Sequence, residues 1–184
     1  MKLDLALVHY PVWNKNREVI GSAVTNLDLH DIARAGKTFG VGTLFIVTPF
    51  ADQQELVREI SAHWLQGYGA HYNPDRRDAF SCMKVCASLE SLYEEYNRQG
   101  IDRPLTLATS ARGQEEMIDY ADLRQRLAGG EHCLILFGTG WGLAPEVMAK
   151  VDAILPPIGE NKAYNHLSVR SACAIVLDRL VGDR

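Results

Sequence analysis

The sequence predicts an α/β fold, with a mostly parallel sheet covered by helices on both faces. Short, almost wholly apolar runs alternate along the chain with longer stretches in which apolar residues recur every three or four positions. The short runs lack the alternation of a half-exposed sheet, which is typical of strands buried on both faces. Strands that alternate with helices pair in parallel through right-handed crossovers.

In the first half of the chain, polar residues divide the pattern into two strands and two helices. Asn26 or Asp28 is expected to cap the first helix, because short polar side chains accept hydrogen bonds from free first-turn amides. Gly40 ends that helix, and the second helix carries an apolar stripe at helical spacing. The expected segments, in order, are strand 3–9, loop 10–25, helix 26–39, strand 43–47 and helix 51–66.

In the second half, glycines and prolines separate four further strands from four further helices. The expected segments are loop 67–78, strand 83–87, helix 89–99, strand 105–109, helix 120–128, strand 133–137, helix 145–150, strand 153–155 and helix 168–180. The chain contains no internal repeat or linker. Residues 1–184 are therefore predicted to form a single domain.

Composition narrows the class of protein. With 47% hydrophobic and 23% charged residues, the chain is neither disordered nor a disulfide scaffold. A net charge of −4 argues against a general nucleic-acid coat but leaves room for a local basic patch. No apolar run approaches the roughly 20 residues of a membrane span, and an acid at Asp4 interrupts any signal peptide, so we expect a cytoplasmic protein with no membrane partner. The four cysteines lack zinc-site spacing, and we expect no metal.

Three loops that follow strands are candidates for a ligand site, because ligands of open parallel sheets bind beyond the carboxyl ends of the strands. They are 109–113, 138–143 and 156–161. The loop 138–143, GTGWGL, has glycine at alternate positions, so its backbone can approach a flat ligand without Cβ clashes. Its spacing is not the dinucleotide fingerprint, and it lacks the Lys-Ser/Thr pair of a phosphate loop. A tight turn without a ligand is the alternative.

Three segments, in order, resemble the SPOUT superfamily of α/β-knot, S-adenosylmethionine-dependent RNA methyltransferases. They are NLDLHDIARAGKTFGV at 26–41, LILFG at 134–138 with the glycine loop, and LPPIG at 155–159 followed by LSVRSACAI at 167–175. The chain is most similar to a small family of predicted RNA methyltransferases that is also found attached to bacterial tRNA guanine-N1 methyltransferase. The resemblance implies a C-terminal trefoil knot, a homodimer, and tRNA or rRNA as the substrate.

The resemblance also assigns site residues. The S-adenosylmethionine pocket would be lined by Thr109, Gly138, Gly140, Trp141, Gly142, Leu155, Ile158, Leu167 and Val169. Catalysis would involve Arg34, as a cation near the acceptor, with Asn26 and His166. The RNA would be contacted by Lys15, Arg17, Arg112 and Arg170.

Ordinary roles compete with each catalytic assignment. Arg34 can be a surface arginine, Asn26 a helix cap, and His166 a loop histidine bonded to a carbonyl. His30, one turn before Arg34, is either a base or an exposed helix residue. Ser168 has the better position to cap the last helix.

The chain departs from the ribose-methylating relatives at two motifs. It has no Glu in the glycine loop, and it has His166 where they carry an Asn. A catalytically inactive S-adenosylmethionine-binding regulatory domain therefore remains an alternative, as does a nucleotide-binding α/β protein without a knot.

Overall fold

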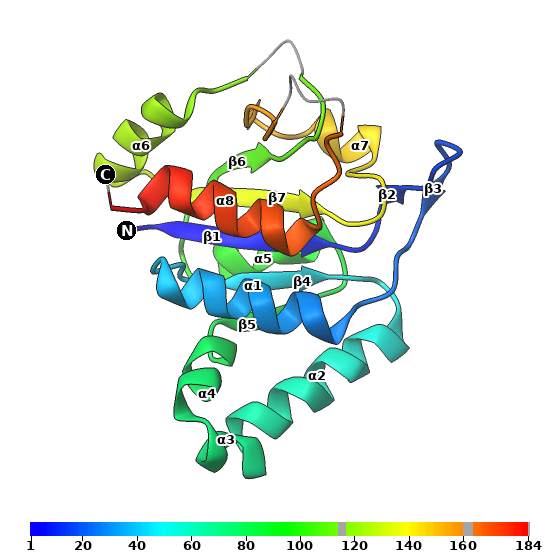
Figure 1. Ribbon diagram of the computed structural model, residues 1–184, viewed down its shortest axis with the longest axis vertical. Coiled ribbons are helices and arrows are strands. Elements are labelled where there is room, and N and C mark those ends of the chain that lie inside the picture. Colours follow the sequence, from blue (N-terminus) through cyan, green and yellow to red (C-terminus); the bar gives the residue numbers. More distant parts are fainter. Residues whose placement is uncertain (114–116, 160–163, 184) are drawn as a thin grey trace.

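A six-stranded parallel sheet forms the centre of the molecule (Figure 1). The computed structural model describes residues 1–113, 117–159 and 164–183. In the strand order β5-β4-β1-β7-β6-β8, every pairing is parallel, which confirms the predicted class. The strands are β1 (Leu3–Val8), β4 (Leu44–Val47), β5 (Met83–Cys86), β6 (Leu105–Ala108), β7 (Cys133–Gly138) and β8 (Ala153–Ile154).

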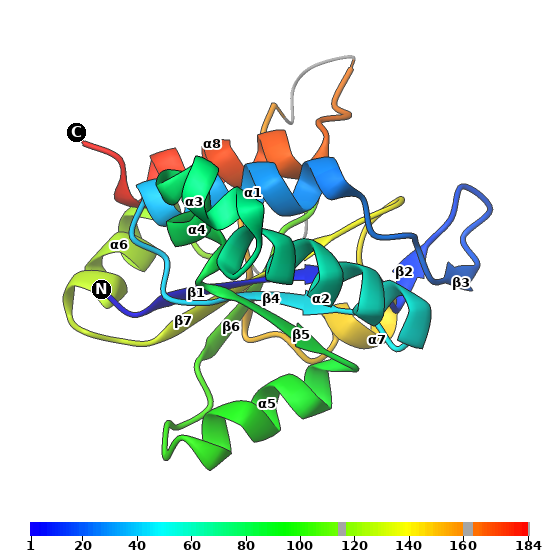
Figure 2. The same cartoon turned by 90° about the horizontal axis from the view of Figure 1, so that it is seen from below.

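Helices cover both faces of this sheet, as predicted (Figure 2). Successive residues of β1 point to opposite faces, so Leu5 and Leu7 join one apolar core while Ala6 and Val8 join the other. The first core is covered by α1 (Asn26–Thr38), α2 (Ala51–Leu65), α4 (Pro74–Phe80), α6 (Tyr120–Ala128) and α8 (Val169–Val181). The second is covered by α5 (Leu89–Arg98) and α7 (Pro145–Met148).

Helices α1 and α8 lie side by side over the middle of the sheet (Figure 1). Both begin at the edge where the strands end, and Ser168 caps α8 by accepting from the Ser171 amide, as expected (3.3 Å). The cap of α1 is Thr25, whose hydroxyl accepts from the Asp28 amide and donates to the Asp28 carboxylate (2.7 Å). The prediction that Asn26 or Asp28 caps α1 was therefore wrong. The prediction overlooked Thr25, whose hydroxyl forms hydrogen bonds with both the amide and the carboxylate of Asp28.

Two segments predicted as loops contain regular structure. Residues 10–25 include an antiparallel hairpin of β2 (Val12–Trp13) and β3 (Val19–Ile20). Residues 67–78 contain α3 (Tyr68–Tyr72) and most of α4. Two-residue strands and a five-residue helix are too short to show a period, so sequence pattern does not detect them.

Asp4 holds together the amino ends of the strands. Its buried carboxylate accepts from Tyr96 Oη (2.7 Å) and the Thr43 amide (2.6 Å), and lies 2.7 Å from His132 Nε2. Burial, together with the Asp4 charge, raises the pKa of the Tyr96 hydroxyl, which keeps it a donor. One carboxylate thus satisfies groups from three separate segments.

Removing this carboxylate is expected to cost about 3 kcal/mol of unfolding free energy in Asp4→Ala, because buried donors lose their acceptor. Urea denaturation measures the loss. Asp122→Ala, an exposed acid in the first turn of α6, is the control and should change stability by about 0.5 kcal/mol. A loss in Asp4→Ala as small as that of the control would contradict the assignment.

Candidate functional site

The glycine loop 138–143 is fastened to the β2–β3 hairpin by backbone hydrogen bonds. The Trp13 amide donates to the Gly142 carbonyl (2.9 Å), and the Trp141 amide donates to the Trp13 carbonyl (3.0 Å). Val12 and Leu143 form an antiparallel bridge beside these bonds. The hairpin therefore forms one wall of the carboxyl edge of the sheet.

The loop requires its glycines. A Cβ on Gly138 would lie 2.5 Å from the Leu143 amide nitrogen, so the space beside this backbone is closed to a side chain. Gly140 and Gly142 have φ of +59° and +107°, which L side chains rarely adopt. Gly138 and Gly140 therefore let the loop pack tightly against its own backbone and against the hairpin, while Gly142, where a Cβ would meet nothing within 4 Å, has an open side.

The loops after β6 and β8 flank the glycine loop. The Thr109 amide and hydroxyl both donate to the Leu136 carbonyl (3.1 Å each), which anchors the loop after β6 to β7. Leu155 is buried in the first core, and half-buried Ile158 packs against that core with part of its apolar surface exposed. Asn165 Nδ2 donates to the Ala111 carbonyl (2.8 Å) and joins the segment before α8 to the loop after β6. Positions 160 and 161 of the predicted third loop lie outside the described residues.

An exposed aromatic cluster lies beside the glycine loop and consists of Trp141, Tyr164 and His166. The His166 ring is 6.2 Å from Trp141 and 5.3 Å from Tyr164, each in an edge-to-face arrangement. Trp141 is 60% exposed and Tyr164 76% exposed. The structure thus brings together Trp141 and His166, predicted from two motifs 25 positions apart in the sequence. Leu167, 46% exposed, and half-buried Val169 continue from this cluster into α8.

The other predicted residues are more dispersed. Arg34 is exposed on α1, and its guanidinium has no hydrogen bond or ion pair within the described part of the chain. It lies eight positions after Asn26, which begins the helix, and this is a rise of about 12 Å away from the carboxyl edge. Lys15 and Arg17 are exposed in the hairpin turn, and Arg112 is exposed after β6. These assignments stay predictions.

Arg170 is held inside the chain by two acids. Its guanidinium lies 3.0 Å from Asp28 Oδ1 and 3.3 Å from Asp31 Oδ2, so it joins the first turns of α8 and α1. Sequence reasoning missed the two acids. Their spacing of three places them on one face of α1, but only the packing of α1 against α8 supplies the arginine.

His30 packs among aromatic rings. It lies 4.7 Å from the Phe80 ring and 5.3 Å from the Trp64 ring, and its Nδ1 is buried without a partner among the described residues. Burial, followed by the charge of Arg76, lowers its pKa. Of the two alternatives, the exposed helix residue does not hold, because α2 and α4 cover this face of α1 and leave His30 half-buried.

Sequence reasoning also missed His9. It follows β1 directly and is fully buried, and burial lowers its pKa to about 4. Its Nδ1 lies 3.0 Å from Ser22 Oγ, and Ser22 Oγ is hydrogen-bonded to Thr139 Oγ1 in the glycine loop. A polar residue at the end of an apolar strand was the available signal.

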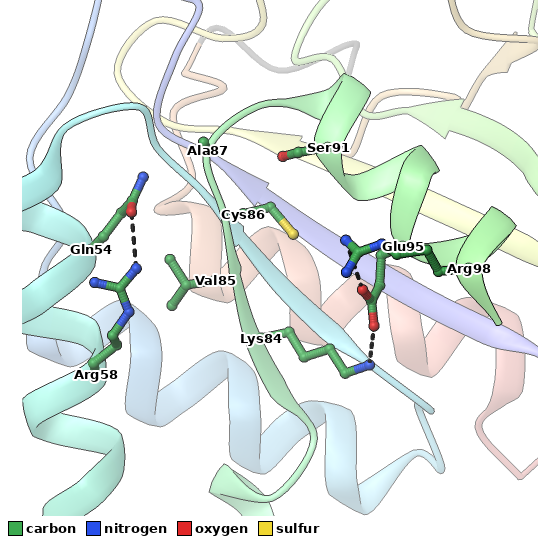
Figure 3. Close-up of a pocket in the computed structure, with 9 residues that line it drawn as sticks. All are labelled: Gln54, Arg58, Lys84, Val85, Cys86, Ala87, Ser91, Glu95 and Arg98. Carbon is green, nitrogen blue, oxygen red and sulfur yellow. Dashed lines mark hydrogen bonds and ion pairs between the residues drawn. The ribbon is translucent and has the colours of Figure 1, made fainter.

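A pocket of about 460 Å³ lies at the β5 edge of the sheet, between α2 and α5 (Figure 3). Its cations are already paired, since Lys84 and Arg98 both contact Glu95 (3.0 Å each) and Arg58 contacts Glu55 (3.2 Å). Two strands, β4 and β1, separate β5 from the glycine-loop strand β7. This pocket is therefore not part of the candidate site.

Residues 1–113, 117–159 and 164–183 contain neither a membrane-spanning helix nor a cluster of metal ligands. None of the helices there is long and apolar enough to cross a membrane. No group of three or more His, Cys, Asp or Glu side chains in the same residues is arranged to hold a metal ion.

The sequence and fold are similar to those of known methyltransferases. A family model described as SAM-dependent RNA methyltransferase matches residues 2–182. A tRNA (guanine-N(1)-)-methyltransferase of Oleidesulfovibrio alaskensis is 43% identical over 98% of this chain, which spans only 42% of that protein's length. An uncharacterized protein of Aquifex aeolicus is 36% identical over 96% of this chain and 86% of its own.

The fold resembles that of a solved structure with bound cofactor. The SpoU methyltransferase AviRb from Streptomyces viridochromogenes, in complex with AdoMet, matches with a TM-score of 0.61 at 14% identity, over 97% of this chain and 56% of that one. At this identity the likeness concerns the fold.

Proposed function

The chain belongs to the SAM-dependent RNA methyltransferase family, and from that premise we propose where it binds its cofactor and RNA. The cofactor site is the glycine loop with the two loops that flank it. The observation that carries this proposal is the open side of Gly142, where a Cβ would meet nothing within 4 Å, in a loop whose tight turn depends on Gly138 and Gly140. These features leave main-chain groups open to a ligand.

The residues present fit S-adenosylmethionine. Main-chain groups of Gly138, Gly140 and Gly142 would meet the flat adenine, while Leu155 and Ile158 supply its apolar walls. The other residues that we propose to line the cofactor pocket are Thr109, Trp141, Leu167 and Val169. When bound, the cofactor supplies an electrophilic methyl group for an in-line displacement.

The aromatic cluster is proposed to receive the target nucleotide. Trp141 and Tyr164 expose ring surface on which a base can stack, and such stacking is the usual way in which proteins hold unpaired RNA bases. His166 lies between them, within reach of a base or ribose held there, and takes up the acceptor's proton. Arg34 stabilises the developing charge or binds the adjacent phosphate.

Arg34 is proposed to act across a homodimer. It is exposed and about 12 Å along α1 from the carboxyl edge, which favours a site that a second copy completes with its own glycine loop. The dimer, the C-terminal trefoil knot and a cytoplasmic location are further parts of this proposal. The substrate is proposed to be a tRNA, in line with the names of the relatives, and the RNA contacts are Lys15, Arg17 and Arg112.

The test is transfer of a radioactive methyl group from S-adenosylmethionine to undermodified total RNA, with calorimetry of the cofactor in parallel. Labelled tRNA supports the full proposal, and labelled rRNA alone contradicts the tRNA assignment. Cofactor binding without labelled RNA would favour the inactive regulatory domain. Binding of NAD or FMN in place of S-adenosylmethionine would contradict the cofactor site.

A further inference from the structure

A partly buried chain of hydrogen bonds connects the end of β1 to the glycine loop. His9 Nδ1 lies 3.0 Å from Ser22 Oγ, which is hydrogen-bonded to Thr139 Oγ1. Thr139 Oγ1 lies 3.0 Å from the Val8 carbonyl, and the Ser22 amide donates to the His9 carbonyl (2.8 Å). The chain thus joins β1, the segment that follows the hairpin, and the glycine loop.

The direction of each hydrogen bond follows from the acceptor at its end. The Val8 carbonyl can only accept, so the Thr139 hydroxyl donates to it and must accept from Ser22. Ser22 has one proton to give, and its other possible acceptor, the His9 carbonyl, is 3.5 Å away. Ser22 therefore accepts from His9, whose Nδ1 carries the proton.

His9 is a neutral imidazole with its Nε2 lone pair unused, for two reasons. Complete burial disfavours the charged form, although Asp28 lies near enough to oppose this effect. Nε2 is buried and has no partner among the described residues. The neutral His9 imidazole donates from Nδ1 in a fixed direction and so orients the Ser22 hydroxyl. Its lowered pKa keeps His9 neutral near pH 7.

The glycine loop needs a side-chain hydrogen bond that fixes its conformation. Three of its six residues are glycine, which gives the backbone more freedom than any other residue. Thr139 lies between Gly138 and Gly140 and is the buried polar residue of the loop. Fixing its side chain fixes the backbone on either side of it.

We propose that His9 is a positioning residue for the cofactor, acting through Ser22 and Thr139 to hold the glycine loop in its binding conformation. This inference rests on the proposed cofactor site. His9 itself touches no reacting atom. Its loss is expected to weaken S-adenosylmethionine binding by loosening the loop.

The test measures S-adenosylmethionine affinity by calorimetry in single and double variants. His9→Leu and Thr139→Val should each raise the Kd about tenfold, and the double variant should be no weaker than either single one, because both break the same chain. His9→Asn should stay within about twofold of wild type, since its amide can donate in place of Nδ1. Thr106→Val, a buried threonine at the start of β6, is the matched control and should not change the Kd.

Each outcome decides the matter. Additive losses in the double variant, or an equal loss in His9→Asn and His9→Leu, would overturn the inference. An equal loss in Thr106→Val would show general destabilisation instead. If His9→Leu does not fold, His9→Ala paired with Thr139→Val tests the same coupling. Wild-type protein that binds no S-adenosylmethionine would overturn the proposed cofactor site. Wild-type protein that binds it, with additive losses in the double variant, would overturn only the role of His9.

Discussion

Replacing Arg34 by alanine is expected to lower methyl transfer by at least about 100-fold and to leave S-adenosylmethionine affinity within about twofold of wild type. The side chain is exposed and has no hydrogen bond or ion pair to the glycine loop among the described residues, so we expect cofactor binding not to depend on it. A cation that stabilises charge at the acceptor acts mainly on the chemical step. Single-turnover methylation and calorimetry separate the two effects. Arg58→Ala, an exposed arginine on α2, is the control and should retain full transfer.

The proposed origin of Arg34 in the second protomer has its own test. Arg34→Ala protein is mixed with Gly138→Ala protein under conditions that exchange subunits. In a site formed across the dimer, half of the molecules are mixed and each regains one complete site, which restores about a quarter of wild-type activity. If Arg34 acts within its own chain, no mixed molecule contains a complete site and activity stays absent.

Gly138→Ala is expected to abolish cofactor binding, with a loss of affinity of about 100-fold or more. The added Cβ would lie 2.5 Å from the Leu143 nitrogen and 2.8 Å from the Gly142 carbonyl carbon, and both are backbone atoms that cannot rotate away. The loop must shift, at a cost of about 2–3 kcal/mol in unfolding free energy. Calorimetry and urea denaturation measure the two losses.

Gly130→Ala is the matched control for this substitution. Its φ is +88°, yet a Cβ there would meet nothing within 4 Å, so it adds backbone strain without a clash. It should cost about 1 kcal/mol of stability and leave cofactor affinity unchanged. Gly138→Ala protein that binds S-adenosylmethionine normally would contradict the placement of the cofactor against this loop.

The regular elements of the sheet were predictable because burial on both faces leaves an unambiguous apolar run, as in β1 and β7. The hairpin and α3 were not, since their few residues show no period, and the hairpin is stabilised by bonds to a distant segment. The Trp13 amide, for example, finds its acceptor at Gly142. Such a partner depends on the fold and leaves no local pattern.

The candidate site likewise contains residues that the sequence predicts and residues that it does not. In the loop after β7, glycine itself signals a position where a Cβ would clash or strain the backbone, so residue type alone pointed to these residues. The pairing of Arg170 with Asp28 and the contact of His9 with Ser22 need helix packing and chain crossings that no spacing encodes. For these residues, polarity within an apolar context was the only available signal.

The hairpin that carries Lys15 and Arg17 shares its backbone hydrogen bonds with the glycine loop. RNA that immobilises the hairpin therefore also restricts the glycine loop. The loop then loses less conformational entropy when it binds S-adenosylmethionine. Thermodynamic reciprocity then requires the small ligand to tighten RNA binding by the same factor. In such an enzyme the two substrates favour each other's retention, so the complex with both bound gains population over either binary complex.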